Sequence, residues 1–218
     1  MPRLGKDGRH SVAETACCAQ SRCRPWWDGI RERFDGRRTV TLDWRGLGAS
    51  DKPESDYSTR LFAAVVVAVL DHLGLGRADV YGTSMGGRVA QWLAVDHPER
   101  VDHLVLGCTS PGGPRAVHRE PAVTRSLGAA GPEALRALLE LTYTPRWLAE
   151  HPGPHQVVGD DAMTVLSRRS HLRASNRHDA WSDLPGVGAP TLILHGSDDL
   201  MTPVRNAELL QELIVGRN

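Results

Sequence analysis

The pentapeptide Gly82-Thr83-Ser84-Met85-Gly86 places a serine between two glycines in the pattern G-x-S-x-G. This pattern is typical of a nucleophile elbow, a strained turn from a strand into a helix that presents the serine hydroxyl beyond the edge of a sheet. The chemistry would be attack by the Ser84 hydroxyl on a carbonyl carbon. The amide of Met85, at the start of the following helix, would stabilise the negative charge that develops on the carbonyl oxygen.

The residues around this pentapeptide supply the setting that an elbow requires. A short strand is predicted at 79–81, and an amphipathic helix is predicted from Met85 to Asp96, where Val89, Ala90, Trp92, Leu93 and Val95 recur at helical spacing. His97-Pro98 ends that helix. The alternative is a glycine-rich strand-to-helix turn in which Ser84 has no chemical role.

The wider pattern alternates short apolar strands with helices, which indicates an α/β fold with a mostly parallel sheet and flanking helices. Further strands are predicted at 39–43, 101–108 and 190–195. Further helices are predicted at 59–73, ended by Gly74 and Gly76, and at 206–215.

Residues 109–183 interrupt this alternation with a stretch rich in proline and glycine. Short helices are predicted there at 132–141, 145–150 and 160–169. The stretch would form an insertion over one end of the sheet. Its arginines and histidines indicate a solvated surface or, alternatively, a polar pocket, and the histidines are His118, His151, His155, His171 and His178.

Composition narrows the possible partners. The chain has 218 residues with 26 basic and 26 acidic side chains, a formal net charge of zero. This balance argues against a nucleic-acid or anionic-membrane partner and favours a small molecule. The longest apolar run, residues 61–70, is half of the roughly 20 residues that a bilayer span requires. Residues 1–25 contain no apolar leader core, so we expect a cytoplasmic protein.

The four cysteines do not form a spaced pair of pairs. They are Cys17, Cys18, Cys23 and Cys108. We expect free thiols or small buried side chains, and no metal site.

Several motifs together make the chain from Trp26 to Asn218 similar to the α/β-hydrolase family. Asp43-Trp-Arg-Gly-Leu-Gly-Ala-Ser50 resembles the family's D-x-R-G-x-G-x-S loop, and Gly82 to Gly87 resembles its extended elbow. His97-Pro-Glu-Arg-Val101 resembles the connection that follows the elbow helix. The resemblance implies an α/β-hydrolase fold with a helical cap insertion.

The same resemblance implies a position for the acid of a catalytic triad. The stretch from Pro190 to Pro203, with Gly196-Ser-Asp-Asp199, is similar to the strand and loop that carry it. By this match the acid is Asp199, and its neighbour Asp198 is the alternative. The resemblance also divides the chain into an atypical N-terminal segment (1–25), a hydrolase core (26–108 and 184–218) and a cap (109–183).

The expected histidine is missing from the triad. In this family the order along the chain is serine, acid, histidine, and the imidazole removes the serine proton. None of residues 200–218, which follow Asp199, is a histidine. His195 is interpreted as a strand-end residue. Three further histidines, His72, His97 and His103, are expected on a helix, at the surface or on a strand, remote from the elbow. Two histidines of the cap, His171 and His178, would have to swing toward Ser84 to act as the base.

The N-terminal part also departs from the family pattern. The family places an apolar strand ending in His-Gly before the tryptophan that Trp26 or Trp27 resembles, and here residues 11–18 stand in that slot. In the family this strand supplies a second oxyanion amide and lies between the strands matched here at 39–43 and 79–81. Unless residues 11–18 fill this place in the sheet, N-terminal strands of the family are missing. The family's last strand is missing as well. We therefore hypothesise a reading frame that is truncated or frame-shifted at both ends.

The resemblance implies a hydrolase that acts on a carboxylic ester or lactone through an acyl-enzyme, without a cofactor. Ser84 would be the nucleophile, Asp199 the orienting acid and Met85 an oxyanion donor, with Gly82 and Gly86 shaping the elbow. The chain resembles bacterial 3-oxoadipate enol-lactonases and carboxylesterases, although haloperoxidase-like or C–C bond hydrolysis would use the same triad. The alternative is an inactive homologue that acts as a binding module, or a fragment without function.

Overall fold

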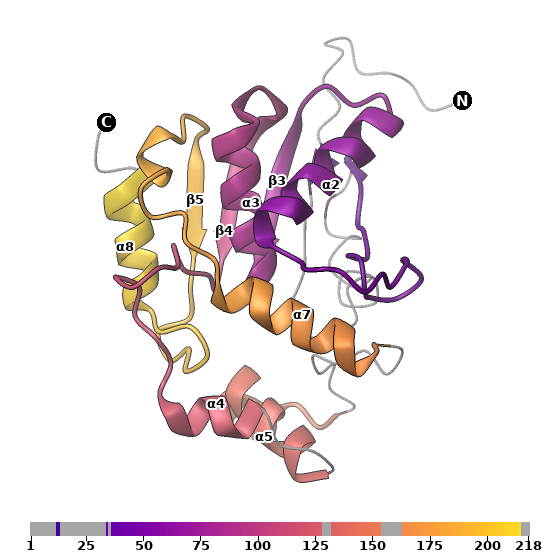
Figure 1. Ribbon diagram of the computed structural model, residues 1–218. Coiled ribbons are helices and arrows are strands. Elements are labelled where there is room, and N and C mark those ends of the chain that lie inside the picture. The colour runs from indigo at the N-terminus through magenta and orange to yellow at the C-terminus, as the bar shows by residue number, and fades with distance from the viewer. Residues whose placement is uncertain (1–11, 14–33, 35, 128–131, 154–162, 215–218) are drawn as a thin grey trace.

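A parallel three-stranded sheet forms the centre of the protein. The computed structural model describes residues 12–13, 34, 36–127, 132–153 and 163–214 (Figure 1). Within these, β3 (Ala78–Thr83), β4 (Val101–Gly107) and β5 (Thr191–Leu194) pair in the order β3-β4-β5. The register aligns Gly82 with Leu106 and Leu106 with Ile193. Because all three strands run the same way, their carboxyl ends meet at one edge.

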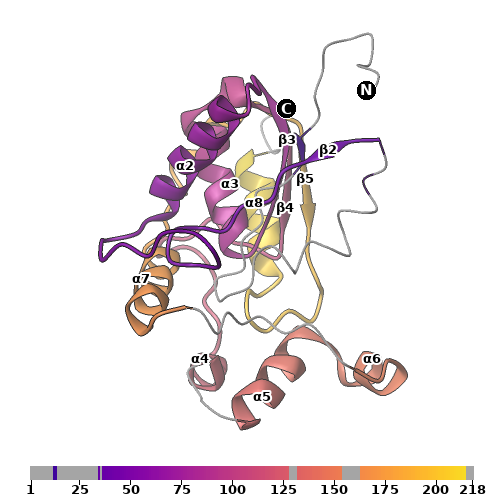
Figure 2. The same cartoon turned by 90° about the vertical axis from the view of Figure 1, so that its right-hand side faces the viewer.

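Three helices cover one face of this sheet. Figure 2 shows α2 (Thr59–His72), α3 (Met85–Asp96) and α8 (Arg205–Ile214) together on one side of β3, β4 and β5. Large apolar side chains from the sheet and from this helical layer are fully buried, among them Phe62, Leu93, Leu104, Leu106 and Leu210. Burial of this apolar surface is the main force that holds the helices on the sheet.

The ends of these helices follow from local residues. The Ser58 side chain accepts a hydrogen bond from the Leu61 amide at the start of α2, as N-cap serines do. Gly74, with φ of +67°, takes up the left-handed conformation that ends α2. Pro98 starts a short 3-10 turn, η1 (Pro98–Arg100), which separates α3 from β4.

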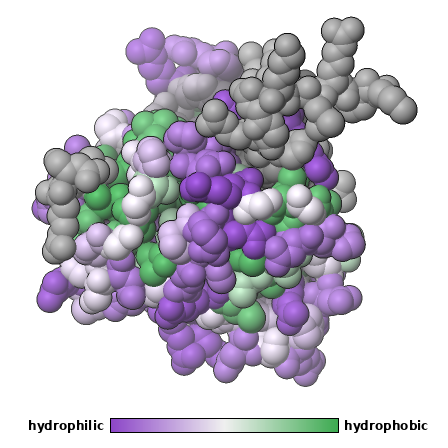
Figure 3. All heavy atoms as spheres, turned by 90° about the horizontal axis from the view of Figure 1, so that it is seen from above, coloured by the Kyte–Doolittle hydropathy of each residue, from purple (hydrophilic) through white to green (hydrophobic). Residues whose placement is uncertain are grey.

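The remaining helices lie at the carboxyl end of the strands. They are α4 (Pro121–Leu127), α5 (Pro132–Thr142), α6 (Pro145–Glu150) and α7 (Val165–Asn176). In Figure 1 they lie below the sheet, at the end where α3 begins, and Figure 2 shows α4, α5 and α6 at the same end. The turn η2 (Leu184–Gly186) then leads into β5. Seen from the opposite end, the described surface is mainly hydrophilic, with several hydrophobic patches between the hydrophilic regions (Figure 3).

Most predicted elements are confirmed to within a few residues, and three differ. The strand predicted at 39–43 is wrong in its bounds, because β2 comprises Arg38–Thr39, although Val40 and Leu42 still pack against the core. The helix predicted at 160–169 is also wrong, because Thr164 caps α7 by accepting from the Ser167 amide. The helix α4 was not predicted.

Part of the questioned N-terminal slot is filled. The strand β1 (Val12–Ala13) pairs in parallel with β2, which joins Val12 to Arg38 and Ala13 to Thr39. The strand β1 also contacts β3. These two residues therefore lie between β2 and β3, in the place of the strand that the sequence left in question. Residue 11 and residues 14–18, which complete the predicted slot, lie outside the described residues, as do most of residues 1–25.

Among the described residues, no helix is both long enough and apolar enough to cross a lipid bilayer.

Candidate active site

Ser84 occupies a strained junction between β3 and α3. Its backbone has φ of 53° and ψ of −119°, a conformation that non-glycine residues rarely adopt. Such a conformation costs on the order of 1–3 kcal/mol and persists only where the surrounding structure enforces it. Here the Ser84 amide donates to the Gly107 carbonyl at 2.9 Å, and the Thr109 hydroxyl donates to the Ser84 carbonyl at 2.7 Å.

Glycines on either side of Ser84 allow this close packing. A Cβ added to Gly82 would lie 2.8 Å from the Ala90 Cβ and would also collide with the backbone of Gly86. A Cβ added to Gly87 would lie 2.6 Å from the Thr109 Cβ. The helix therefore packs directly on β3 and on the residues that follow β4, and Ser84 stays at the carboxyl edge.

Met85 is the first residue of α3, and its side chain is buried. Amides in the first turn of a helix have no acceptor within the helix, and the helix dipole adds positive character there. The Met85 amide thus has the position that an oxyanion donor beside Ser84 requires.

Asp199 lies in the loop after β5, at the same edge. Its Oδ1 accepts from the amides of Met201 and Thr202, both at 2.8 Å, and its side chain is 13% exposed. These contacts fix Oδ1, while Oδ2 lies 3.5 Å from His195 Nε2. Asp198 is exposed. Asp199 is thus the more buried and the more firmly held of the two carboxylates.

Among the described histidines, His195 is the one that contacts this acid. It follows the last residue of β5, its side chain is 3% exposed, and its Nε2 lies 3.5 Å from Asp199 Oδ2. The same nitrogen donates to the Thr202 carbonyl at 2.6 Å. The ring therefore braces the acid loop.

The two cap histidines considered as a base are both engaged elsewhere. His171 Nε2 donates to the Arg45 carbonyl at 2.6 Å, and its ring stacks on Phe62. His178 contacts Thr59 Oγ1 at 3.0 Å and Gln91 Oε1 at 3.1 Å. Burial lowers the pKa of His171 and, with repulsion from Arg88, lowers that of His178 well below its ordinary value.

The other histidines considered lie away from the elbow. His103, on β4, contacts Asp79 at 2.7 Å, and His97 ends α3. His72 lies in the last turn of α2. Within the described part of the chain, no histidine forms a hydrogen bond with Ser84, and His10 and His155 lie outside it.

A family model described as alpha/beta hydrolase fold matches residues 23–133, which is just over half of the 218-residue chain. The chain belongs to the α/β-hydrolase fold family.

Curated relatives of this hydrolase chain include enzymes of two kinds. It is 29% identical over 194 residues to 3-oxoadipate enol-lactonase 2 of Acinetobacter baylyi, covering 87% of this chain and 72% of the relative. It is 30% identical over 194 residues to 2-hydroxymuconate semialdehyde hydrolase of Pseudomonas putida, covering 82% of this chain and 66% of the relative. The enol-lactonase structure from Burkholderia xenovorans LB400 shares the fold, with a TM-score of 0.76 at 23% identity, over 97% of this chain and 82% of the other.

Cys108 is a site residue whose position the sequence did not predict. It follows β4 with φ of 46°, and its amide donates to the Leu194 carbonyl at 2.9 Å. Burial raises the pKa of its thiol, and the neighbouring Asp199 carboxylate raises it further. Because the thiolate is the reactive form, Cys108 is a poor nucleophile at this edge of the hydrolase sheet.

A buried polar network, which the sequence analysis also missed, joins α3 to α7. Arg88, four residues after Ser84, donates through one nitrogen to the Ser175 hydroxyl at 2.7 Å and through another to the Ser110 hydroxyl at 3.1 Å. Gln91 donates to the Ser110 carbonyl at 3.1 Å and holds His178 through its amide oxygen. The one available signal was the helical spacing of Ser84, Arg88 and Gln91, which places them on one side of α3.

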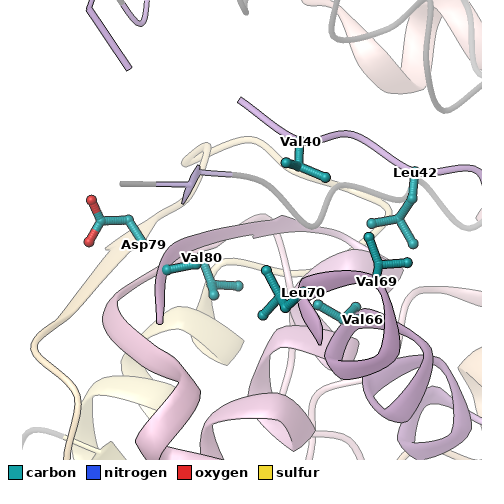
Figure 4. A pocket seen from close by; sticks show the side chains of 8 residues that line it. Val40, Leu42, Val66, Val69, Leu70, Asp79 and Val80 are labelled. Carbon is teal, nitrogen blue, oxygen red and sulfur yellow. The ribbon is translucent and has the colours of Figure 1, made fainter. Parts of the chain in front are cut away.

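Two cavities border β2 or the residues that follow it. One, of about 10 Å³, is lined by apolar side chains of α2 and β3 and by Val40 and Leu42, with Asp79 at its rim (Figure 4). The other, of about 440 Å³, is open and lies around Arg38 to Thr41, Asp43, Ala49, Ser50 and Leu73. Neither is lined by Ser84 or Asp199, so we do not assign either to the substrate.

No group of three or more His, Cys, Asp or Glu side chains that could hold a metal ion occurs in the part of the chain that the structure describes.

Proposed function

We propose that this protein hydrolyses a carboxylic ester or lactone through Ser84. The observation that carries the proposal is the strained backbone of Ser84 at the start of α3, at the sheet edge that also holds Asp199. Strain that the surroundings enforce on a reactive residue is a feature of functional sites. The relatives support the substrate class, since one of them is an enol-lactonase.

In this mechanism the Ser84 oxygen attacks the carbonyl carbon, and the oxygen of the carbonyl becomes negatively charged next to the Met85 amide. Collapse of this intermediate expels the alcohol, or opens the lactone ring, and leaves an acyl group on Ser84. Water then releases the acid. No described histidine contacts Ser84, so its proton would pass through water to the oxygen that leaves. Asp199 would stabilise the positive charge that develops along this path.

The experiment that tests the proposal is hydrolysis of p-nitrophenyl butyrate by the wild-type protein and by Ser84→Ala. We expect turnover that Ser84→Ala abolishes, while Ser197→Ala, an exposed serine of the acid loop, retains it. Equal rates for wild type and Ser84→Ala would refute the role of Ser84.

The second candidate is a binding module that retains the site without turnover. It is favoured by the contacts of His171, His178 and His195, each of which is held by a partner other than Ser84. Loss of the general base costs several orders of magnitude in rate. A wild-type protein that binds an ester but does not hydrolyse it above the Ser84→Ala rate would support this candidate.

A further inference from the structure

A second strained residue follows the strand next to the elbow. Among the non-glycine residues that the structure describes, Ser84 and Cys108 are the two with positive φ, at 53° and 46°. The register pairs Thr83 with Gly107, so the two strained residues follow equivalent positions of β3 and β4. Strain of this kind persists only where the surrounding structure enforces it. The conformation of Cys108 therefore calls for an explanation, and the residue after it, Thr109, supplies one.

Hydrogen bonds on both sides of Thr109 hold it in place. Before it, the Cys108 amide donates to the Leu194 carbonyl of β5 at 2.9 Å. After it, the Ser110 carbonyl accepts from the side-chain amide of Gln91 on α3 at 3.1 Å. The chain around Thr109 is thus fixed both to the sheet and to the helix that Ser84 begins.

The side chain of Thr109 packs against the first turn of α3. It is 1% exposed, and a Cβ added to Gly87 would lie 2.6 Å from the Thr109 Cβ, so a glycine leaves the space that this side chain occupies. Its hydroxyl donates to the Ser84 carbonyl at 2.7 Å. The bond that the helix itself makes to this carbonyl, from the Arg88 amide, is longer at 3.3 Å. The threonine hydroxyl is therefore the closer of these two donors.

The Ser84 carbonyl and the Met85 N–H belong to one peptide unit. A trans peptide unit is planar, and its C=O and N–H bonds point in opposite directions. A hydrogen bond that fixes the Ser84 carbonyl therefore also fixes the direction of the Met85 N–H. Such a bond also polarises the peptide unit and strengthens its N–H as a donor.

We propose that Thr109 is a positioning residue of the reaction, which orients the Met85 amide toward the oxyanion through its hydrogen bond to the Ser84 carbonyl. This inference rests on the proposed function, since it takes Met85 as the oxyanion donor. An oxyanion donor binds the transition state more strongly than the substrate, so a misoriented donor lowers kcat and leaves KM nearly unchanged. A threonine that only stabilised the fold would change neither constant of the folded enzyme.

The kinetic test uses hydrolysis of p-nitrophenyl butyrate. We expect Thr109→Val, which keeps the shape of the side chain and removes the hydroxyl, to lower kcat about tenfold or more with little change in KM. Thr109→Ser, which keeps the hydroxyl, should restore most of kcat. The matched control is Thr59→Val, which removes another buried hydroxyl, one that contacts His178 at 3.0 Å. It should lower the stability and retain kcat.

The spectroscopic test follows the Met85 amide by NMR in the full-length, ¹⁵N-labelled protein. The signal of an amide responds to a hydrogen bond on the carbonyl of its own peptide unit, because that bond polarises the unit. We expect the Met85 signal to shift in Thr109→Val, to return toward its wild-type position in Thr109→Ser, and to stay in place in Thr59→Val.

An unchanged Met85 signal in Thr109→Val, an unchanged kcat in that variant, or a loss that Thr109→Ser does not reverse would each overturn the inference. Its failure is distinguishable from failure of the proposed function. Equal rates for wild type and Ser84→Ala would refute the role of Ser84. The Met85 signal requires no turnover, so it decides by itself whether Thr109 orients this amide.

Discussion

The backbone of Ser84 connects local strain to reactivity. Its φ of 53° and ψ of −119° form a backbone conformation that glycine adopts at lower energetic cost than a residue with a side chain. The surrounding hydrogen bonds to Gly107 and Thr109 maintain this geometry. The protein thus gives up stability at this one residue to keep a hydroxyl at the edge of the sheet.

A pair of substitutions measures that strain. We expect Ser84→Gly to be more stable than Ser84→Ala by about 1 kcal/mol, because glycine adopts positive φ without a Cβ clash. Chemical denaturation of the two variants gives the difference directly. Equal stability, or a more stable alanine variant, would show that Ser84 is not strained.

Neighbouring aspartates allow an equally sharp test of the acid. We expect Asp199→Asn to lower kcat for p-nitrophenyl butyrate about tenfold or more, because Asp199 is the carboxylate held at the edge of the sheet that carries Ser84 and would stabilise charge there. Asp198→Asn should leave kcat unchanged, since that side chain is exposed. The reverse pattern in steady-state kinetics would transfer the role to Asp198.

The sequence predicted Ser84, Met85 and Asp199 because each belongs to a local motif. It did not predict Arg88 or Cys108 as neighbours of these residues. Their positions depend on contacts between segments distant in the chain, such as Arg88 with Ser175 and Cys108 with Leu194, and no local pattern encodes such contacts.

Elements with a strong local pattern were predicted well. The bounds of α3 follow from its apolar spacing and from Pro98, and those of α2 from its dense apolar run and Gly74. The start of α7 was wrong because its buried stripe is Ser167, Ser170, His171, Ala174 and Ser175, which has no large aliphatic periodicity. The bounds of β2 could not be predicted because strand pairing depends on a partner distant in sequence.

The close packing at the junction between β3 and α3 predicts that Gly82 cannot be replaced without a loss of stability. Gly82→Ala should destabilise the protein by about 1–3 kcal/mol or more, because its Cβ would meet Ala90 and the backbone of Gly86, which cannot move aside. Gly76→Ala is the matched control, since nothing lies within 4 Å of a Cβ there. Thermal denaturation of both variants should show a loss only for Gly82→Ala.

At the scale of the whole molecule, buried polar contacts join the helices that cover the sheet to residues 163–180. Thr59 on α2 and Gln91 on α3 both contact His178, which follows α7. Gln91 donates its amide to Ser110, so its oxygen faces His178 and accepts from Nε2, while Nδ1 accepts from Thr59. This arrangement uses the neutral imidazole.

The neutral state of His178 gives the whole protein a pH dependence. Its pKa is well below 6.5 in the folded protein, whereas the unfolded chain has the ordinary value. Below about pH 6.5 the unfolded state therefore binds more protons, and the free energy of unfolding falls by up to about 1.4 kcal/mol per pH unit for this group. The stability that neutral His178 contributes is fully present above that pH.

Urea denaturation between pH 7.5 and 5 checks this dependence. We expect His178→Gln to lower the stability at pH 7.5 and to flatten its fall toward pH 5, while His118→Gln, an exposed histidine, leaves the slope as in the wild type. His171, whose pKa is also lowered by burial, accounts for part of the remaining slope. An unchanged slope in His178→Gln would show that His178 is not held neutral.

The most direct measurement of the central claim is the mass of the protein after brief reaction with p-nitrophenyl acetate and acid quenching, followed by peptide mapping. The account predicts one acetyl group on Ser84, absent in Ser84→Ala, and none on Cys108. No adduct on the wild-type protein, or an adduct on Cys108 instead of Ser84, would contradict it.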